Sequence, residues 1–434
     1  MEHISVWREN AELPRFDALG GDTRTDVLII GGGMAGILCA RELRDRGIDC
    51  MLVEAKNICS GITENTTAKI TLQHGLIYDK MIRRFGTEGA RMYVCAQSDA
   101  MSRYQKLCEG IECDYEEKDS FVYSLSDRSK IEKEVVSMQR LGLKADFTDD
   151  LPLPFDVAGA VRLPRQAQFD PLKFILNISS DLPIFENTKV LEHGRGWAKT
   201  DRGTVKAKAI IVATHFPFLN KHGSFFLKLY QHRSYVSALE KAPDVHGMYV
   251  DEDEKGMSFR NYKDLLLLGG GGHRTGKNGG NWQELEAFAK KHYPGARIHA
   301  KWATQDCMTL DGIPYIGKYS SRTPHLFVAT GFNKWGMTSS MVAATLLADL
   351  IEGKKNVYAE IFSPSRSILR PQLAVNAAES ILGLITPTVP RCPHLGCALR
   401  YNKAEHSWDC PCHGSRFSET GRLINNPATD DKRK

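Results

Sequence analysis

The sequence predicts an α/β protein with an α+β second domain and a small all-β module at its C-terminal end. Three observations support this prediction. A glycine-rich turn joins two short apolar strands between residues 26 and 54. Alternating apolar and polar segments recur between residues 225 and 300, a pattern typical of antiparallel strands. Cysteine and histidine residues crowd together between positions 392 and 413.

The first apolar strand, Val27–Ile30, runs into a turn that fits the pattern G-x-G-x-x-G. Gly31 permits the tight turn, Gly33 permits close approach of a pyrophosphate, and Gly36 permits packing of helix on strand. The helix that follows offers the free N–H groups of its first turn, and a positive dipole end, to phosphates. The residues that we assign to this phosphate cradle are Gly31, Gly33, Met34, Ala35 and Gly36.

An acidic residue, Glu54, ends the second apolar strand about 20 residues after the turn. Its carboxylate is placed to accept a hydrogen bond from a ribose hydroxyl. A carboxylate here argues against a cofactor with a 2′-phosphate. The motif therefore predicts a dinucleotide and leaves FAD and NAD both open.

The overall composition indicates an ordinary globular protein of 434 residues. Its formal charge of +5 comes without a long basic run, so we expect no nucleic-acid partner. No apolar run is long enough for an integral membrane segment, and the start lacks a signal-peptide pattern, so we expect a cytoplasmic protein. In a reducing compartment, the cluster formed by Cys392, Cys397, Cys410 and Cys412 indicates metal binding rather than disulfides.

A run of small and hydroxyl residues, 59–71, follows the second strand directly. Thr66 and Thr67 are expected to lie along the phosphates and ring of the cofactor, although the same run also suits the capped start of a helix. Lys69 either places a charge near the ring or is a solvated lysine.

The rest of the chain supplies the elements of two domains. Residues 78–144 are helical and amphipathic, interrupted by strand-like Phe121–Ser124. A helix follows Pro171, and we expect strands at 183–190 and 210–215, the latter with a hairpin partner at 204–209. Helices are expected at 282–292 and 339–352, the second one after a strand and a glycine turn at 326–338.

These pieces resemble the D-amino-acid oxidase group of FAD-dependent oxidoreductases, which includes glycine and sarcosine oxidases. The resemblance spans about residues 5–362 and rests on segments that occur in the family's order: Val27–Ala40, Glu54, Glu186–Val190, Ile211–Thr214, Asp311–Gly317 and Ala329–Thr338. It implies FAD rather than NAD. It also implies a Rossmann-like FAD-binding domain made of discontinuous segments, and a substrate domain built on an antiparallel sheet.

The resemblance sets boundaries and further cofactor contacts. The oxidoreductase covers residues 1–365, with FAD-binding segments at about 1–75, 165–220 and 300–365 and substrate segments at 76–164 and 221–299. We expect Val190 to meet the adenine and Ala213 to line the sheet edge. Gly312, Gly331, Met337 and Thr338 are expected to face the flavin ring. Some relatives attach their flavin to a cysteine before the Asp-Gly turn. Thr304 stands nearest to that position here, so we expect non-covalent FAD.

After a helical linker, 366–390, the spacing C-x-H, fifteen residues, then C-x-x-H supplies two thiolates and two imidazoles. These residues are Cys392, His394, Cys410 and His413. Two thiolates can hold one iron of a [2Fe–2S] cluster and two neutral imidazoles the other. The alternative is a tetrahedral zinc site with the same ligands.

The stretch 391–428 resembles the Rieske family, which assigns those four residues as cluster ligands and places a Rieske [2Fe–2S] domain at 391–434. The same resemblance implies a bridge between Cys397 and Cys412, unless these thiols stay reduced, and a hydrogen bond from Ser415 to the cluster. Phe417 stands where high-potential relatives carry tyrosine. The strands that normally precede the first cysteine loop are replaced by a helix at 371–386, so we expect the module to lean on the flavoprotein body.

Taken together, these features predict an FAD-dependent oxidoreductase that oxidises a small amine, amino acid or related acid. Electrons would pass from flavin through the cluster to an acceptor, which can be a redox protein. The candidates for catalysis or for holding a substrate carboxylate are Lys69, His74, Arg260, Tyr262 and Arg274. The alternatives are an oxygen-reducing oxidase with a structural cluster, and an electron-transfer flavoprotein or reductase without an organic substrate.

Overall fold

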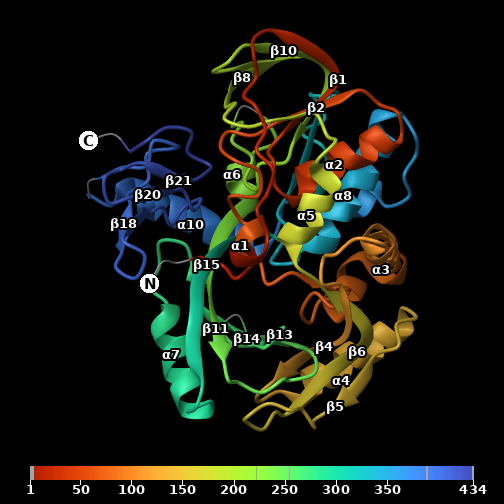
Figure 1. Ribbon diagram of the computed structural model, residues 1–434, viewed down its shortest axis with the longest axis vertical. Coiled ribbons are helices and arrows are strands. Elements are labelled where there is room, and N and C mark those ends of the chain that lie inside the picture. Colours follow the sequence, from red (N-terminus) through yellow and green to blue (C-terminus); the bar gives the residue numbers. More distant parts are fainter. Residues whose placement is uncertain (1–3, 221, 254, 388–389, 433–434) are drawn as a thin grey trace.

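The computed structural model describes residues 4–220, 222–253, 255–387 and 390–432, whose strands form three sheets (Figure 1). A largely parallel sheet and a long, mostly antiparallel sheet make up the body, and a small sheet near the C-terminus lies beside the antiparallel one. This arrangement confirms the predicted fold class. In the described part of the chain, no helix is long and apolar enough to cross a membrane.

The first sheet contains the predicted dinucleotide-binding strands. Its order is β16 (Tyr315–Lys318), β17 (Leu326–Thr330), β10 (Thr204–Val212), β1 (Thr23–Ile30), β2 (Cys50–Val53), β7 (Ile184–Phe185), with β9 (Trp197–Thr200) and β8 (Val190–Gly194) extending from β10. Strands β17, β10, β1, β2 and β7 are parallel, so their carboxyl ends meet at one edge.

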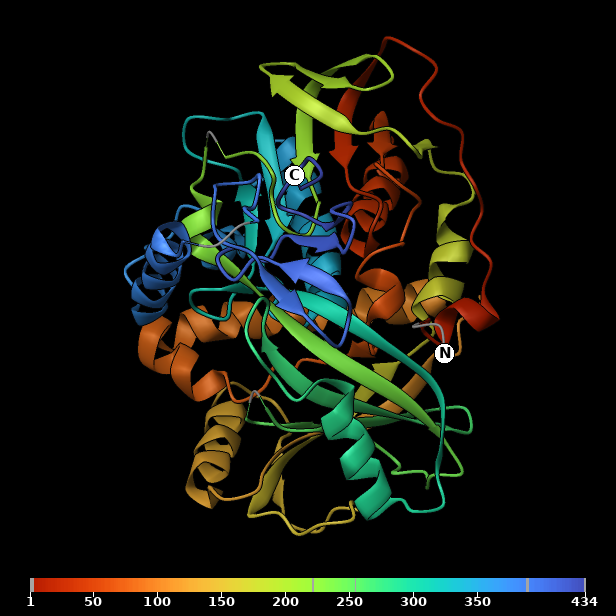
Figure 2. The same cartoon turned by 90° about the vertical axis from the view of Figure 1, so that its left-hand side faces the viewer.

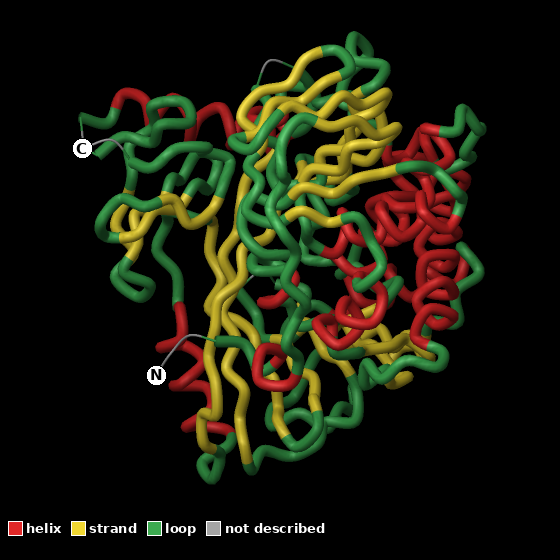
Figure 3. The backbone as a smooth tube through the Cα atoms, turned by 45° about the horizontal axis from the view of Figure 1, so that its top comes forward, coloured by secondary structure: helices red, strands yellow, loops and turns green. Residues whose placement is uncertain are grey.

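Alternate residues of β1 enter two different cores. Val27 and Ile29 pack with the helices α2 (Met34–Asp45), α5 (Pro171–Ser179) and α8 (Gly336–Ile351). Leu28 and Ile30 pack on the opposite face with residues of β8, β10 and β16. A strand covered on both faces must be apolar throughout its buried length, as this one is. Figure 1 shows α2, α5 and α8 close together beside β1 and β2, and Figure 3 shows that most helices gather on one side of the strands.

The second sheet forms the substrate domain. Its order is β15 (Arg297–Thr309), β11 (Leu229–Glu240), β14 (Leu265–Arg274), β13 (Ser258–Tyr262), β12 (Met248–Asp251), β4 (Glu116–Ser124), β6 (Gly159–Gln168), β3 (Lys69–Ile70), with β5 (Asp146–Thr148) beside β6. The helices on this domain are α3 (Tyr78–Cys108), α4 (Arg128–Arg140) and α7 (Asn281–His292). Strand β3 lies wholly before residue 76 and β15 extends beyond residue 299, outside the segments expected for the substrate domain, yet each pairs with a strand of this sheet.

Two strand predictions differ from the structure. The expected strand at 183–190 is split, since β7 ends at Phe185 and β8 begins only at Val190, with Asn187 at a positive φ of 48° between them. The expected hairpin at 204–215 is one strand, because Thr204–Val212 pairs in a single parallel register with β1. The remaining short elements are α1 (Trp7–Asn10), η1 (Thr63–Asn65), α6 (Phe225–Lys228) and α9 (Ala359–Phe362).

The C-terminal module consists of a helix and a small sheet. Helix α10 (Pro371–Ile385) leads to the antiparallel strands β18 (Arg400–Asn402), β19 (Ser407–Asp409), β20 (Arg416–Ser418) and β21 (Leu423–Asn425). Figure 2 shows this sheet in front of β11 and β15, with α10 at the outer edge of the molecule. The module is joined to the body by buried side chains. Gln231 of β11 donates to the His413 carbonyl at 2.9 Å, and Gln305 of β15 donates to the Gly414 carbonyl at 2.8 Å.

A buried charge cluster completes this junction. Glu405 accepts hydrogen bonds from Arg233 of β11 at 3.0 Å and from Arg416 of β20 at 2.8 Å. Arg416 also donates to Asp409 at 3.0 Å, and the Tyr235 hydroxyl donates to Glu405 at 2.9 Å. Burial alone would raise the pKa of Glu405, but Arg233 and Arg416 hold that pKa at about 2. The carboxylate thus remains ionised and links the module to the body.

Replacing Glu405 with alanine should loosen the module, because the buried Arg233 would lose its carboxylate partner. The expected loss of stability is about 3 kcal/mol, the lower end for breaking a buried ion pair. The temperature at which visible cluster absorption disappears measures this effect, with Glu405→Gln as the conservative control.

Glu405 stabilises the folded state above its ordinary pKa of about 4.3, and this contribution fades as the pH falls toward 2. The difference between wild type and Glu405→Ala in the temperature at which cluster absorption disappears should therefore become smaller as the pH falls over this range. An equal gap at pH 7 and pH 3 would contradict this interpretation.

Candidate functional site

A cavity of about 1020 Å³, here called the central cavity, opens at the carboxyl ends of β1, β2, β10 and β17. Its walls come from both large sheets and from the C-terminal module. Among the predicted cofactor-binding residues, the following line it: Gly31, Gly33, Met34, Ala35, Glu54, Thr66, Thr67, Val190, Ala213, Gly312, Gly331 and Met337. Segments distant in sequence thus converge where open α/β sheets bind their ligands.

The glycine turn has the tight geometry that its sequence predicts. Gly31 has a φ of 112°, and a Cβ there would lie 2.6 Å from the Ala213 carbonyl oxygen. A Cβ on Gly36 would lie 1.9 Å from the Gly31 carbonyl oxygen, so Gly36 is required for packing although it does not line the cavity. Gly33, at the N-cap of α2, has no capping side chain, and the Met34 N–H donates to the Thr63 hydroxyl at 3.0 Å, so Thr63 lies beside the end of the helix that faces the phosphates.

Glu54 is anchored by backbone donors. Its two carboxylate oxygens accept from the N–H of Gly32 at 2.8 Å and from the N–H of Lys56 at 2.9 Å. Burial raises its pKa, and those two donors oppose the shift. The carboxylate is therefore fixed beside the glycine turn, at the position where a ribose hydroxyl can approach.

A second buried acid, Glu186, supports the same end of the cavity and was not among the predicted site residues. It accepts from the N–H of Ile58 at 2.7 Å and from the Asn57 amide at 3.0 Å. The next part of this loop is tied down by Thr188, whose hydroxyl accepts from the N–H of Leu19 at 3.0 Å. The signal available in the sequence was the acid that begins the Glu-Asn-Thr run shortly before Val190.

The other end of the cavity holds two of the catalytic candidates. The Lys69 ammonium donates to the Thr67 hydroxyl at 3.2 Å, and burial lowers the pKa of this lysine to about 7, with Arg260 adding to the shift. His74 lies 2.7 Å from the Tyr93 hydroxyl and stacks on Trp335 at 5.1 Å between ring centroids. Burial lowers the pKa of His74 to about 3, so its ring is neutral. Thr338 lies behind this histidine, with its hydroxyl 3.2 Å from Nε2.

The two predicted arginines are not among the described residues that line the central cavity. Arg260 is buried and donates to the carbonyls of Thr67 at 2.7 Å and Ala68 at 3.1 Å, so it holds the hydroxyl loop. Arg274 donates to the carbonyls of Pro411 at 3.1 Å and Cys412 at 3.2 Å. Neither guanidinium is offered to a substrate carboxylate in this arrangement.

Tyr262, the third residue expected to bind a substrate carboxylate, is hydrogen-bonded to other residues of the protein instead. The Tyr262 hydroxyl lies within hydrogen-bond distance of two carboxylates, 2.8 Å from Asp114 and 2.9 Å from Asp170, and shares its single proton between them. Its ring packs edge-on against Trp7, with the centroids 4.7 Å apart. Tyr262 therefore ties elements of the body together and, like the two arginines, does not line the cavity in the part of the chain that the structure describes.

Thr304 and Cys307 lie on β15 and line the cavity near the Asp-Gly turn. The Cys307 thiol is buried and lies 3.7 Å from the Thr330 hydroxyl. Burial raises its pKa to about 12, so it is a protonated thiol rather than a nucleophilic thiolate.

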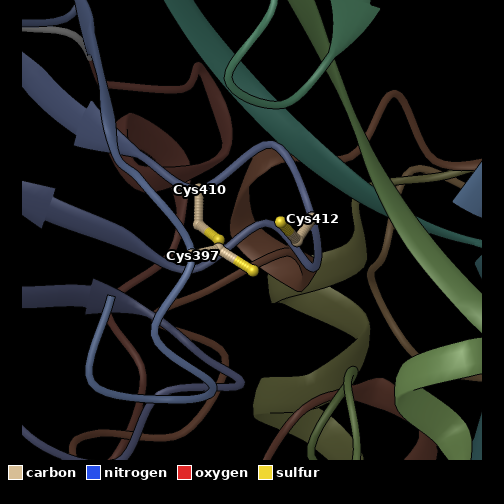
Figure 4. Close-up of side chains that lie close together, drawn as sticks. All are labelled: Cys397, Cys410 and Cys412. Carbon is tan, nitrogen blue, oxygen red and sulfur yellow. The ribbon is translucent and has the colours of Figure 1, made fainter. Parts of the chain in front are cut away.

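The cysteine–histidine loops of the module come together at a second site. The sulfurs of Cys397, Cys410 and Cys412 lie within 4.8 Å of one another (Figure 4). Cys392 contacts Cys410 and the Ser415 hydroxyl, and the rings of His394 and His413 lie 4.9 Å apart. Cys397 and Cys412 are adjacent free thiols.

The donor set suits an iron–sulfur cluster. The Nδ1 atoms of both histidines are buried without a hydrogen-bond partner, which is costly for a polar atom unless a ligand uses it. A neutral imidazole nitrogen is the donor that iron takes from histidine, and thiolates supply the remaining positions. Two thiolates beside two unpartnered imidazole nitrogens therefore fit a Rieske-type centre.

Known protein families match both parts of the chain. The family model of FAD dependent oxidoreductases, DAO, matches residues 26–350, and the Rieske [2Fe-2S] domain model matches residues 366–433. A Bacillus subtilis (strain 168) protein named for a Rieske 2Fe-2S iron-sulfur centre, YhfW, is 35% identical over 98% of this chain and 96% of its own length.

Two further relatives match the oxidoreductase part. Gamma-glutamylputrescine oxidoreductase of Escherichia coli (strain K12) is 23% identical over 84% of this chain and 93% of its own length. Glycine oxidase from Geobacillus kaustophilus superposes with a TM-score of 0.67 at 20% identity, over 80% of this chain and 99% of its own. The chain therefore belongs to the DAO family of FAD-dependent oxidoreductases and carries a C-terminal Rieske [2Fe-2S] domain.

Proposed function

We propose that this protein oxidises a small amine, amino acid or related acid at FAD and delivers the electrons, through its Rieske cluster, to an external acceptor. When bound, FAD accepts a hydride and the cluster accepts single electrons, so the pair converts a two-electron oxidation into one-electron output. The observation that carries the proposal is the short segment that joins the two sites.

That segment is 213–216. Ala213, Thr214 and His215 line the central cavity, while the fully buried Phe216 lies between the cavity and the cluster loops. The Phe216 ring centroid is 6.5 Å from that of His394 and 6.4 Å from that of His413. The backbone that borders the flavin cavity thus continues directly into the surroundings of the two cluster histidines.

The Asn426 amide holds this junction in place. It donates to the carbonyls of Thr214 at 2.6 Å and Phe216 at 2.8 Å. A fixed contact through the buried Phe216 between two redox sites favours electron transfer within the chain over a purely structural cluster.

The wall of the central cavity carries charged side chains of both signs. Arg84 and Arg233 line the cavity, but they are paired with Asp311 and Glu405. Asp251 and Asp306 also line it, and burial raises the pKa of each to about 6, so both are largely ionised at pH 7. These acids can receive an ammonium group beside Lys69 and Lys334, which line the same cavity, and the relative named gamma-glutamylputrescine oxidoreductase supports an amine as the substrate.

An exposed apolar surface lies where electrons would leave. It contains Leu395, within the first cluster loop, and the outward residues of α10: Val375, Ile381, Leu382, Leu384 and Ile385. Leu384 packs toward this loop, because a Cβ on Gly396 would lie 3.9 Å from its Cδ2. Exposed apolar patches of this kind mark protein interaction sites, so we assign the acceptor as a redox protein.

The first test is reduction of the protein without oxygen. Stopped-flow spectra recorded with a panel of amines and amino acids should show flavin bleaching followed by cluster reduction in the same molecule. Bleaching without cluster reduction, with stoichiometric peroxide under air, would instead support an oxygen-reducing oxidase.

Leu395→Glu should slow reoxidation of the cluster by the acceptor protein and leave the rates of flavin bleaching and cluster reduction unchanged.

The ligand set is tested by single substitutions. Cys410→Ser and His413→Ala should abolish the visible absorption and the reduced-state EPR signal of the cluster, because each removes a donor to iron. Cys397→Ser and Cys412→Ser serve as matched controls, since these neighbouring thiols are assigned to a bridge. Loss of the cluster in the controls, with retention in Cys410→Ser, would contradict the assignment.

FAD should be released intact by acid precipitation, because Thr304 offers no thiol and the Cys307 thiol is protonated. The supernatant should be yellow and the pellet colourless, with FAD identified by its mass. A yellow pellet would indicate a covalent flavin, and Cys307→Ser would then show whether this cysteine carries it.

A further inference from the structure

We infer that the tail of the Rieske module, residues 423–429, is part of the FAD site and covers the adenosine end of the cofactor. Residues of this tail line the same cavity as Glu54 and Val190: Leu423, Ile424, Asn425, Asn426, Ala428 and Thr429. The inference depends on the two cofactors and not on the identity of the substrate.

Two lysines of the FAD-binding domain join the tail at this end. Lys56, two residues after Glu54, donates to the Ile424 carbonyl at 3.2 Å. Lys189, immediately before Val190, donates to the Thr429 carbonyl. Because Glu54 and Val190 flank the ribose and adenine positions, these two contacts place the tail over the adenosine half.

The tail is also tied to the cluster loop. The Ala428 N–H donates to the Ser415 hydroxyl at 3.0 Å, and that hydroxyl contacts the Cys392 thiol. The Gln231 amide donates to the Asn426 carbonyl at 3.0 Å and to the His413 carbonyl at 2.9 Å. One set of hydrogen bonds therefore positions both the cluster loop and the wall of the FAD site.

This connection has a physical consequence. FAD cannot leave the adenosine end without displacing the tail, and the tail is held by contacts with the cluster loop. Loss of the cluster should therefore weaken FAD binding, although none of its four assigned ligands is among the described residues that line the central cavity. The Rieske module then acts as a cofactor-retaining element as well as a redox partner.

The experiment compares FAD binding by full-length variants. Flavin is removed, and the dissociation constant of FAD is measured by fluorescence titration for wild type and for Lys56→Met, Lys189→Met and the double variant. We expect each single change to weaken FAD binding about tenfold, the size of one charged hydrogen bond, and the double change to weaken it further. Lys189→Arg should retain most of the affinity, because it keeps a charged donor.

Two controls separate this effect from general destabilisation. Lys206→Met removes an exposed lysine of β10 and should leave the dissociation constant unchanged. The melting temperature of the FAD-free protein should be the same for wild type and lysine variants, while the increase on adding FAD should be smaller for the variants. Cys410→Ser, which lacks the cluster, should also bind FAD more weakly. An FAD dissociation constant within twofold of wild type in the double variant would overturn the inference.

Discussion

The structure depends on the attachment of a small module to a larger sheet. Its four short strands cannot bury a sufficient core by themselves, and the cores of small domains are marginal without further support. Gln231 and Gln305 satisfy the backbone carbonyls of the second cluster loop, and Gln305 also donates to the Gln231 side chain at 2.5 Å. Since the donors come from β11 and β15, the cluster loop takes its shape from the flavoprotein.

The close packing of this interface excludes larger side chains. A Cβ on Gly414 would lie 2.5 Å from Gln231, and a Cβ on Gly276 would lie 2.7 Å from the Pro411 backbone nitrogen. A Cβ on Gly383 of α10 would lie 2.6 Å from the Cys412 sulfur. Glycines at these three contacts allow α10, the second cluster loop and the body of the protein to approach one another closely.

The sequence indicated the chemistry of both sites, but it did not indicate what the two buried arginines bind. Arg274 was expected near a substrate, yet it donates to two carbonyls of the second cluster loop. Arg260 was expected there too, yet it is enclosed beneath the hydroxyl loop. The residues next to an arginine in the sequence do not show whether its guanidinium binds a ligand or a backbone carbonyl, because that partner lies far away in the chain.

The sequence by itself determined the glycine turn, the acid at Glu54 and the cysteine–histidine spacing. In each case the constraint is local: a tight turn demands glycine, and a metal site demands particular donor atoms at short spacing. Only the tertiary structure decided that Asn426 meets Thr214, 212 residues away, and that Lys189 meets Thr429. These contacts involve backbone carbonyls, which every residue carries, so no side-chain pattern marks them in advance. Their positions follow from how the sheets dock, and docking is a property of the whole fold.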